Sequence, residues 1–281
     1  MISRKRMART IAGELLFLLL TLFVLIPVYY FIIGAFKGRL DIVKFPLSIN
    51  LSMIKDVGFS NFSYVFKRMK MFQALLNTGA ITIFSLVIVV ICGSLAGFVI
   101  SRVNRKFFSA VYTTLVALMV VPFIGCLIPL VIQSTQLKTY NSLIGCILIQ
   151  SAWNLPFAVF LFTGFMRALP KELEESAYID GCTMIGTYFK IFLPLLAPVT
   201  ATCCIRGGVG IWNDYLVSNS LLNSVQTPTL MVGINMFFGA RKTEYGYAFA
   251  GIILASLPIV ILFLFLQKYF IKGIVAGAVK G

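Results

Sequence analysis

Long apolar stretches separated by short polar breaks run along the chain from its first residues to its last. Several of these stretches approach or exceed the roughly 20 residues that a helix needs to cross a bilayer. Hydropathy and the polar breaks together predict six membrane-spanning helices. Their approximate ranges are 12–36, 72–101, 108–134, 142–167, 194–219 and 248–270. The predicted fold class is therefore all-α, with one transmembrane domain over residues 1–281.

The first apolar stretch begins as a secretory signal does, with basic residues ahead of an apolar run. The run from Leu15 to Phe36 is, however, longer than the apolar region of a signal. No small-x-small cleavage site closes it either. We therefore expect this stretch to be retained as the first span.

The distribution of basic residues predicts the orientation in the membrane, because cytoplasmic ends of spans carry an excess of Lys and Arg. Basic residues precede the first span, occupy the turn at 102–106 and follow the last span at 268–280. With an even number of spans, this pattern places both termini in the cytoplasm. The predicted outer loop at 37–71 is contrary evidence, since it is also rich in Lys and Arg.

Composition agrees with a membrane protein and narrows its chemistry. Hydrophobic residues make up 59% of the chain and charged residues 12%, whereas a soluble domain of this length would need far more polar surface. The formal charge of +15 is accounted for by residues that flank the spans, and no basic soluble module is present to bind nucleic acid. Since the chain has no histidine, no Ser/His/Asp or Cys/His catalytic arrangement is possible.

Cysteine spacing gives no sign of a metal site. None of the six cysteines shows the paired spacing of zinc ligands, and no histidine is available to complete a set. All six lie in or beside apolar stretches, so we expect them to fill space within the helical bundle. They are Cys92, Cys126, Cys146, Cys182, Cys203 and Cys204.

An acidic cluster interrupts this apolar sequence between the fourth and fifth predicted spans. Glu172, Glu174, Glu175 and Asp180 are four of only nine acidic residues in the chain. The glutamates fall where the first turn of a helix would favour negative charge, and Gly181 is a natural bend. The pattern predicts two short helices in a cytoplasmic loop. By itself, it suits an ordinary amphipathic connector as well as a docking surface.

The spacing of the loop residues resembles a known signature. Glu175-Ser176-Ala177, three residues, Gly181, nine residues and Ile191-x-Leu193-Pro194 resemble the E-A-A–x3–G–x9–I–x–L–P pattern of binding-protein-dependent ABC importer permeases. The departure is serine at the first alanine position, and serine is also small. The stretches 212–234 and 266–281 resemble the carbohydrate branch of that family, of the second-permease-subunit type of maltose and multiple-sugar systems.

The resemblance implies a transport mechanism and a set of partners. In that family the loop, here about 169–194, forms coupling helices that seat in a cleft of a separate ATPase subunit. The expected partners are a second homologous permease, two ATP-binding subunits, an extracytoplasmic solute-binding protein and a carbohydrate, in a bacterial inner or plasma membrane. No cofactor is expected in this chain, because it lacks the G-x-x-x-x-G-K-[ST] phosphate loop. ATP and Mg would be bound by the partner ATPase, and residues 271–281 would form a cytoplasmic tail.

The same resemblance assigns roles to individual residues of the loop. Glu175 would make a charge contact with an Arg or Lys of the ATPase. Ala177 and Gly181, beside Ser176, would allow close approach of the two proteins, and Asp180 would cap the second short helix. The coupling residues expected from the sequence are Glu175, Ser176, Ala177, Asp180 and Gly181.

Polar residues within spans are the candidates for a translocation path, because they cost free energy in lipid and usually face the bundle interior. An aromatic ring beside amides suits a sugar, and the possible path residues are Asn154, Trp212, Asn213 and Asp214. Interhelical hydrogen bonding is the alternative explanation for each of them. Arg206, well inside the fifth predicted span, would either pair with an acid or line a watery path.

Three other functions compete with a carbohydrate importer. An ABC importer for another small solute would share the loop signature but not the C-terminal resemblance. A secondary transporter driven by an ion gradient would show an inverted repeat with matching broken helices, and it would leave residues 170–194 without a role. A scaffold or receptor that transports nothing would not need polar residues in its spans.

Overall fold

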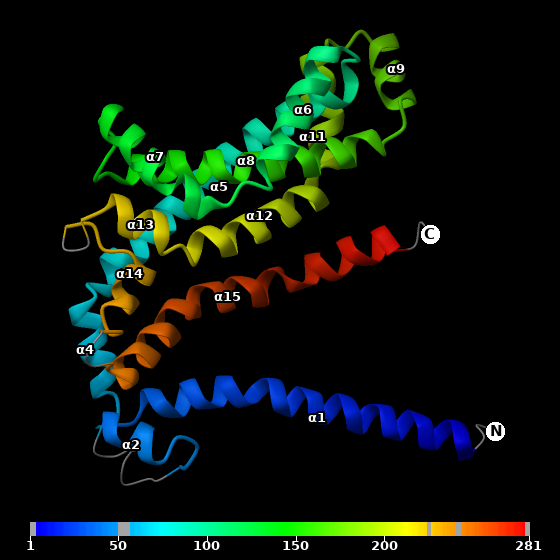
Figure 1. The fold of residues 1–281 in the computed structure, drawn as a ribbon. Coiled ribbons are helices and arrows are strands. Elements are labelled where there is room, and N and C mark those ends of the chain that lie inside the picture. Colours follow the sequence, from blue (N-terminus) through cyan, green and yellow to red (C-terminus); the bar gives the residue numbers. More distant parts are fainter. Residues whose placement is uncertain (1–3, 50–56, 224–225, 240–242, 279–281) are drawn as a thin grey trace. The chain divides into compact units, whose positions relative to one another are not determined.

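The computed structural model describes residues 4–49, 57–223, 226–239 and 243–278. Within these ranges the chain is nearly all helical, and its β pairing is limited to one isolated antiparallel bridge between Phe238 and Thr243. The predicted all-α class is confirmed (Figure 1). Before residue 143 the helices are α1 (Arg4–Ala35), α2 (Arg39–Lys44), α4 (Ser60–Arg68), α5 (Met71–Arg102), α6 (Lys106–Leu118) and α7 (Phe123–Gln136). From there they are α8 (Leu143–Arg167), α9 (Glu172–Ile179), α10 (Met184–Thr187), the π-helix η1 (Tyr188–Phe192), α11 (Leu193–Leu195), α12 (Ala197–Trp212), α13 (Leu216–Leu221), α14 (Leu230–Asn235) and α15 (Tyr245–Ala278).

Three helices are long and apolar enough to cross a membrane: Thr10–Ala35 of α1, α5 and α8. Up to five spans result if two bent pairs each count as one. These pairs are α6 with α7, bent by 108°, and Met184–Leu195 with α12, bent by 71°. Within α15, the apolar helix Tyr245–Ile261 is shorter than the three long spans. The count of six therefore remains a prediction.

The predicted span at 108–134 is interrupted, because α6 ends at Leu118 and α7 begins at Phe123. Pro122 lies directly before α7 in an extended conformation. Proline has no N–H to donate, and it disfavours helical geometry in the residue before it. Hydropathy runs through this break without a change, so only the proline signalled it.

The predicted span at 194–219 is also divided. Helix α12 ends at Trp212 and α13 begins at Leu216. The carboxylate of Asp214 accepts hydrogen bonds from the backbone N–H groups of Val217, at 3.2 Å, and Ser218, at 2.9 Å. It thereby satisfies donors in the first turn of a new helix.

The last helix differs from its predicted limits at both ends. It was expected over 248–270 with a separate tail at 271–281, but α15 begins at Tyr245 and continues to Ala278. Most of the predicted tail is thus helical. Residues 279–281, which include Lys280, lie outside the described residues.

The chain divides into two compact units rather than one, although its assignment to a single transmembrane domain stays a prediction. The first contains Met1–Met71 and Gly233–Pro258, and the second contains Phe72–Val232 and Ile259–Gly281. In the first unit, the ammonium of Lys37 is fully buried and donates to the carbonyl of Phe45 at 2.7 Å. Burial lowers the pKa of Lys37 below its ordinary value, and the nearby Asp41 carboxylate opposes this shift in part.

In the second unit, α5 and α8 pack closely through glycine. A Cβ atom built on Gly93 would lie 2.8 Å from the Ala158 Cβ, and one built on Gly97 would lie 2.8 Å from the Phe162 Cβ. Small residues at this four-residue spacing let two membrane helices bring their backbones together. A buried core on this contact extends to η1 and α12, and its members are Val89, Phe98, Ala158, Phe162, Met166, Tyr188, Phe192, Leu196, Val199 and Cys203.

Candidate functional site

The acidic loop between α8 and α12 contains the two short helices that the sequence predicts. Helix α9 carries Glu172, Glu174 and Glu175 in its first turn, and α10 follows at Met184. The first turn of a helix favours negative charge, because its backbone N–H groups point outward without partners. The local sequence therefore accounts for both the helix and its acidic start.

Gly181 forms the turn between the two short helices. Its φ of +76° is left-handed, a conformation that favours glycine. The N–H of Gly181 donates to the Tyr178 carbonyl at 3.0 Å and the N–H of Cys182 to the Ala177 carbonyl at 2.9 Å. These two bonds are the Schellman arrangement that ends a helix. A Cβ on Gly181 would meet nothing within 4 Å, so the glycine serves the backbone conformation rather than close packing inside this chain.

The predicted cap of the second short helix is wrong. Asp180 is the residue at the C-terminal end of α9. Thr183 caps α10 instead, and its side-chain oxygen accepts a hydrogen bond from the N–H of Gly186 at 3.2 Å. A capping side chain must stand directly before the first helical residue, and the turn at Gly181 and Cys182 separates Asp180 from that position.

The loop divides its small and charged residues between two environments. Ala177 is only 1% exposed, so it packs inside this chain. Glu175, Ser176, Asp180 and Gly181 are exposed. Large apolar side chains are exposed beside them: Tyr178, Ile179 and Ile185. The outward surface of the loop therefore combines acidic groups with uncovered apolar area, as a docking surface does.

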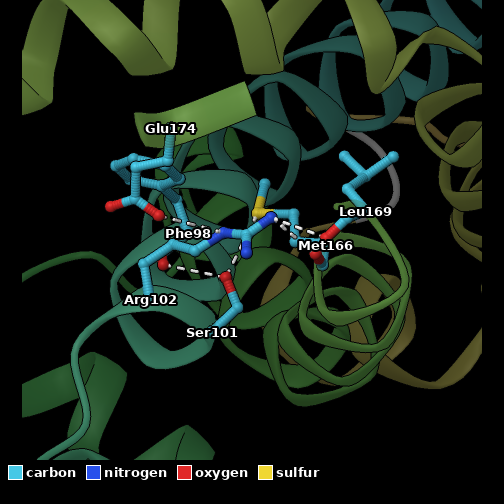
Figure 2. A network of polar contacts seen from close by, with 6 residues as sticks. All are labelled: Phe98, Ser101, Arg102, Met166, Leu169 and Glu174. Atoms are coloured by element: carbon cyan, nitrogen blue, oxygen red, sulfur yellow. Dashed lines mark hydrogen bonds and ion pairs between the residues drawn. The ribbon is translucent and has the colours of Figure 1, made fainter. Parts of the chain in front are cut away.

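Arg102, the last residue of α5, joins this loop to the ends of two long helices (Figure 2). Its Nη2 donates to the carbonyls of Met166 at 2.9 Å and Leu169 at 3.3 Å, where α8 ends. The last carbonyls of a helix have no partner within it, and the helix dipole makes this end negative. A cation there is therefore stabilised both by hydrogen bonds and by the dipole. The side chain of Arg102 is 4% exposed, and hydrogen bonds from a charged donor each contribute about 1.5–3 kcal/mol.

The same guanidinium reaches α9 and η1. Its Nε lies 3.8 Å from Oε2 of Glu174, and its carbon lies 4.8 Å from the centre of the Phe192 ring. An ion pair with a partly exposed carboxylate contributes only about 0.2–1 kcal/mol. The bonds to the α8 carbonyls therefore fix the position of Arg102, and Glu174 adds a weaker hold on the loop.

A second set of contacts holds the far end of the loop on α5. The hydroxyl groups of Tyr188 and Ser94 lie 2.7 Å apart. The ring of Phe98 lies 5.4 Å from that of Tyr188 and 5.0 Å from that of Phe192, measured between centroids. Tyr188 and Phe192 begin and end the π-helix η1, and single π turns often occur at functional sites.

Asn154, a predicted path residue, is 8% exposed on α8. Its Nδ2 donates to the Gln150 carbonyl at 2.8 Å, and its Oδ1 accepts from Nη1 of Arg206 at 3.2 Å. The guanidinium carbon of Arg206 lies 4.2 Å from the centre of the Phe157 ring. Among the described residues, the contacts of Arg206 are thus an amide and an aromatic ring rather than the acid that the sequence allowed.

The other three predicted path residues gather at the end of α12. Trp212 is its last residue, Asn213 is exposed beyond it, and Asp214 is engaged by the first turn of α13. Six residues of helix, about 9 Å at 1.5 Å per residue, separate Trp212 from Arg206. Among the contacts that the structure shows, Asn154 is joined to α12 through Arg206 and not through the three residues at its end.

The role of Arg102 does not follow from the sequence by any local rule, and in the described part of the chain no group of three His, Cys, Asp or Glu residues could hold a metal ion. Arg102 was predicted only as a charge that sets orientation. Its partners Met166 and Leu169 are 64 and 67 residues away, so no local motif marks it.

Comparison with known proteins gives consistent matches. The family described as "Binding-protein-dependent transport system inner membrane component" matches residues 89–275. The melibiose/raffinose/stachyose import permease protein MelC of Bacillus subtilis (strain 168) is 38% identical over 91% of this chain and 91% of its own length. The probable starch degradation products transport system permease protein AmyC of Thermoanaerobacterium thermosulfurigenes is 32% identical over 94% of each chain.

A further relative and a solved structure agree. The arabinooligosaccharides transport system permease protein AraQ of Bacillus subtilis (strain 168) is 30% identical over 96% of each chain. A chain from the crystal structure of a bacterial ABC transporter involved in the import of the acidic polysaccharide alginate aligns with a TM-score of 0.78 and 19% identity. That alignment covers 96% of this chain and 99% of the other, and it shows a shared fold.

Proposed function

Since this chain belongs to the family of binding-protein-dependent transport system inner membrane components, we propose that it is a permease subunit of an ATP-driven carbohydrate importer. The names of its relatives support an oligosaccharide as the substrate class. Three relatives at 30–38% identity are named for the transport of melibiose, raffinose and stachyose, of starch degradation products and of arabinooligosaccharides. Sugars linked in short chains are common to all three names.

The outward surface of the loop at 169–194 is the observation that carries the coupling part of this proposal. Exposed Glu175 and Asp180 stand beside the exposed apolar side chains of Tyr178 and Ile179. A basic, partly apolar cleft on a separate ATPase subunit would complement both features. Glu175 supplies the charge contact, and Ser176 and Gly181 allow close approach. Ala177 is buried within this chain, so it stabilises the loop by packing and does not contact the partner.

The complete importer in this proposal has several other components. A second permease related to this one completes the transmembrane path, and an extracytoplasmic solute-binding protein delivers the sugar. Two ATPase subunits bind ATP and Mg on the cytoplasmic side, where both termini of this chain also lie. Closure of the ATPase subunits moves the loop, and the permease pair changes from inward-open to outward-open.

We place Asn154, Trp212 and Asn213 along the translocation path. Their amides and indole ring offer the hydrogen-bonding and stacking groups that a sugar needs. Asp214 is accounted for by its bonds to Val217 and Ser218, so it supports the path as a helix cap. Arg206, held by Asn154 and Phe157, orders the amide of Asn154.

Substrate-stimulated ATP hydrolysis by the reconstituted complex, together with uptake, tests the substrate class. The permease pair, the ATPase and the binding protein are assembled in vesicles, and ATP hydrolysis is measured across a panel of oligosaccharides, amino acids and polyamines. Stimulation by oligosaccharides alone supports the proposal. Stimulation by another solute class, or uptake that needs an ion gradient but no ATP, would contradict it.

Charge reversal at Glu175 tests the coupling surface. Glu175→Arg would place a cation against the basic cleft, and opposed like charges cost several kcal/mol, so we expect ATPase affinity to fall by at least about tenfold. Lys138→Glu is the matched control, because this exposed lysine precedes α8 at the end opposite to the loop. Wild-type association and wild-type substrate-stimulated hydrolysis in Glu175→Arg would remove Glu175 from the contact.

A further inference from the structure

We propose that Arg102 is a positioning residue for transport: it ties the ends of α5 and α8 together and pairs with Glu174 of α9, so that a displacement of the loop moves these two helices together. This inference rests on the proposed coupling role of the loop. It assigns a transmission function to a residue that lies outside the loop and outside the signature spacing.

The first support is the number of elements that one buried side chain joins. Arg102 belongs to α5, donates to the Met166 and Leu169 carbonyls at the end of α8, and lies beside Glu174 of α9 (Figure 2). Its guanidinium also stacks over Phe192 of η1. Four elements, α5, α8, α9 and η1, therefore contact one rigid, planar group with fixed donor directions.

The second support is that Arg102 binds the end of α8 through hydrogen bonds but contacts α9 only through a longer ion pair. The bonds to the α8 carbonyls, at 2.9 and 3.3 Å, are formed. The Nε of Arg102, in contrast, is buried and has no hydrogen-bond partner among the described residues, although Oε2 of Glu174 lies 3.8 Å away. A shift of α9 by about 1 Å would bring this pair to hydrogen-bonding distance. The helix side of Arg102 is thus fixed, and the loop side can tighten when the loop moves.

The third support is a second attachment of the loop to the same helix. Tyr188, which follows α10, meets Ser94 of α5 at 2.7 Å between hydroxyl oxygens. The loop is therefore attached to α5 near its start through Glu174 and near its end through Tyr188. A force applied to α9 and α10 reaches α5 through these side chains, in addition to the peptide chain that leads to α8 and α12.

The experiment uses the assembled complex with the second permease, the ATPase and the binding protein. Glu174→Gln removes the charge of the ion pair and leaves the α8 carbonyls bonded to Arg102. Arg102→Gln removes both holds. Arg105→Gln is the matched control, since Arg105 is exposed three residues further on and carries the same charge. Two quantities are measured for each variant: hydrogen exchange of the backbone in residues 172–181, and substrate transported per ATP hydrolysed.

We expect exchange in 172–181 to rise about threefold in Glu174→Gln and by at least as much in Arg102→Gln, which loses the same ion pair together with the bonds at the end of α8. Transport per ATP should fall in both variants and stay unchanged in Arg105→Gln. A cap that only stabilises α8 would not lower transport per ATP in Glu174→Gln, which leaves that cap intact. If Arg102→Gln fails to assemble, Arg102→Lys, which keeps the charge but not the planar fork, takes its place.

Two results would overturn the role of Arg102. One is unchanged exchange in Glu174→Gln and in the Arg102 variant that assembles. The other is faster exchange with normal transport per ATP. Failure of the coupling proposal itself is recognised separately, because Glu175→Arg would then bind the ATPase normally whatever the Arg102 variants do.

Discussion

Single residues in the loop have roles that their spacing alone does not reveal. Gly181 occupies a signature position, and its left-handed φ of +76° gives the physical reason for glycine there. Ala177, at another signature position, is buried instead of being presented to a partner. Residues of one motif therefore meet different demands: one sets the backbone, one fills the core and Glu175 is exposed.

Gly181→Ala tests the backbone demand. An L-residue held in left-handed geometry costs about 1–2 kcal/mol, and the empty space around Gly181 removes any steric cause. We expect faster hydrogen exchange in the turn at 178–184, with little effect elsewhere. Gly186→Ala is the control, because its nearest built contact is an ordinary 3.4 Å to Oγ1 of Thr183. Equal exchange in both variants would count against the turn as the reason for glycine.

At this scale, the sequence predicted what depends on neighbours in the chain. The acidic first turn of α9 and the bend at Gly181 follow from local rules, and both are confirmed. The cap at Asp180 was predicted wrongly because the length of the turn decides which residue precedes α10. Arg102 could not be recognised, since its partners are brought to it only by the packing of α5 against α8.

At the scale of elements, close helix packing decides where the loop is held. Arg102 and Ser94 lie on α5, which packs against α8 at Gly93 and Gly97, and from there they reach Glu174 and Tyr188 of the loop. The sequence showed the two apolar helices but not this contact. Hydropathy also missed the breaks at 119–122 and 213–215, because it measures composition and is insensitive to caps and to proline geometry.

Gly97→Ala tests this packing. A methyl group there would lie 2.8 Å from the Phe162 Cβ and 3.0 Å from the Thr163 backbone nitrogen, and neither atom is the end of a flexible chain. We expect a loss of about 1–3 kcal/mol in stability, seen as a lower midpoint of thermal unfolding in detergent. Gly79→Ala on the same helix meets nothing within 4 Å and should unfold like the wild type. A normal midpoint for Gly97→Ala would mean that the two helices are not in close contact.

At the scale of the whole molecule, family membership and membrane character are settled by the comparisons and by the apolar helices. The family resemblance that the loop spacing predicted is confirmed. The orientation in the membrane remains a prediction from the distribution of basic residues. The loop at 169–194 and the turn at 137–142 lie at opposite ends of α8. If the loop is cytoplasmic, the turn must therefore lie on the outer side of the membrane.

Single cysteines at the two ends of α8 test this orientation. Tyr178 is 65% exposed and Tyr140 is 50% exposed, so a cysteine at either position is accessible once the six native cysteines are replaced. In vesicles without the ATPase subunits, which would cover Tyr178, a maleimide that cannot cross membranes should label Tyr178→Cys when the vesicles are inside-out and Tyr140→Cys when they are right-side-out. The reverse pattern would place the loop on the outer side and would end the coupling proposal.

The buried ammonium of Lys37 gives the first unit an unusual response to alkali. Because folding lowers the pKa of this group below 10.5, the folded chain holds its proton less tightly than the unfolded chain does. The contribution of Lys37 to stability therefore increases as pH rises from below the lowered pKa to above 10.5. A lysine stabilised by a salt bridge would show the opposite trend. Deprotonation also leaves the amine a donor, so its bond to the Phe45 carbonyl survives the loss of charge.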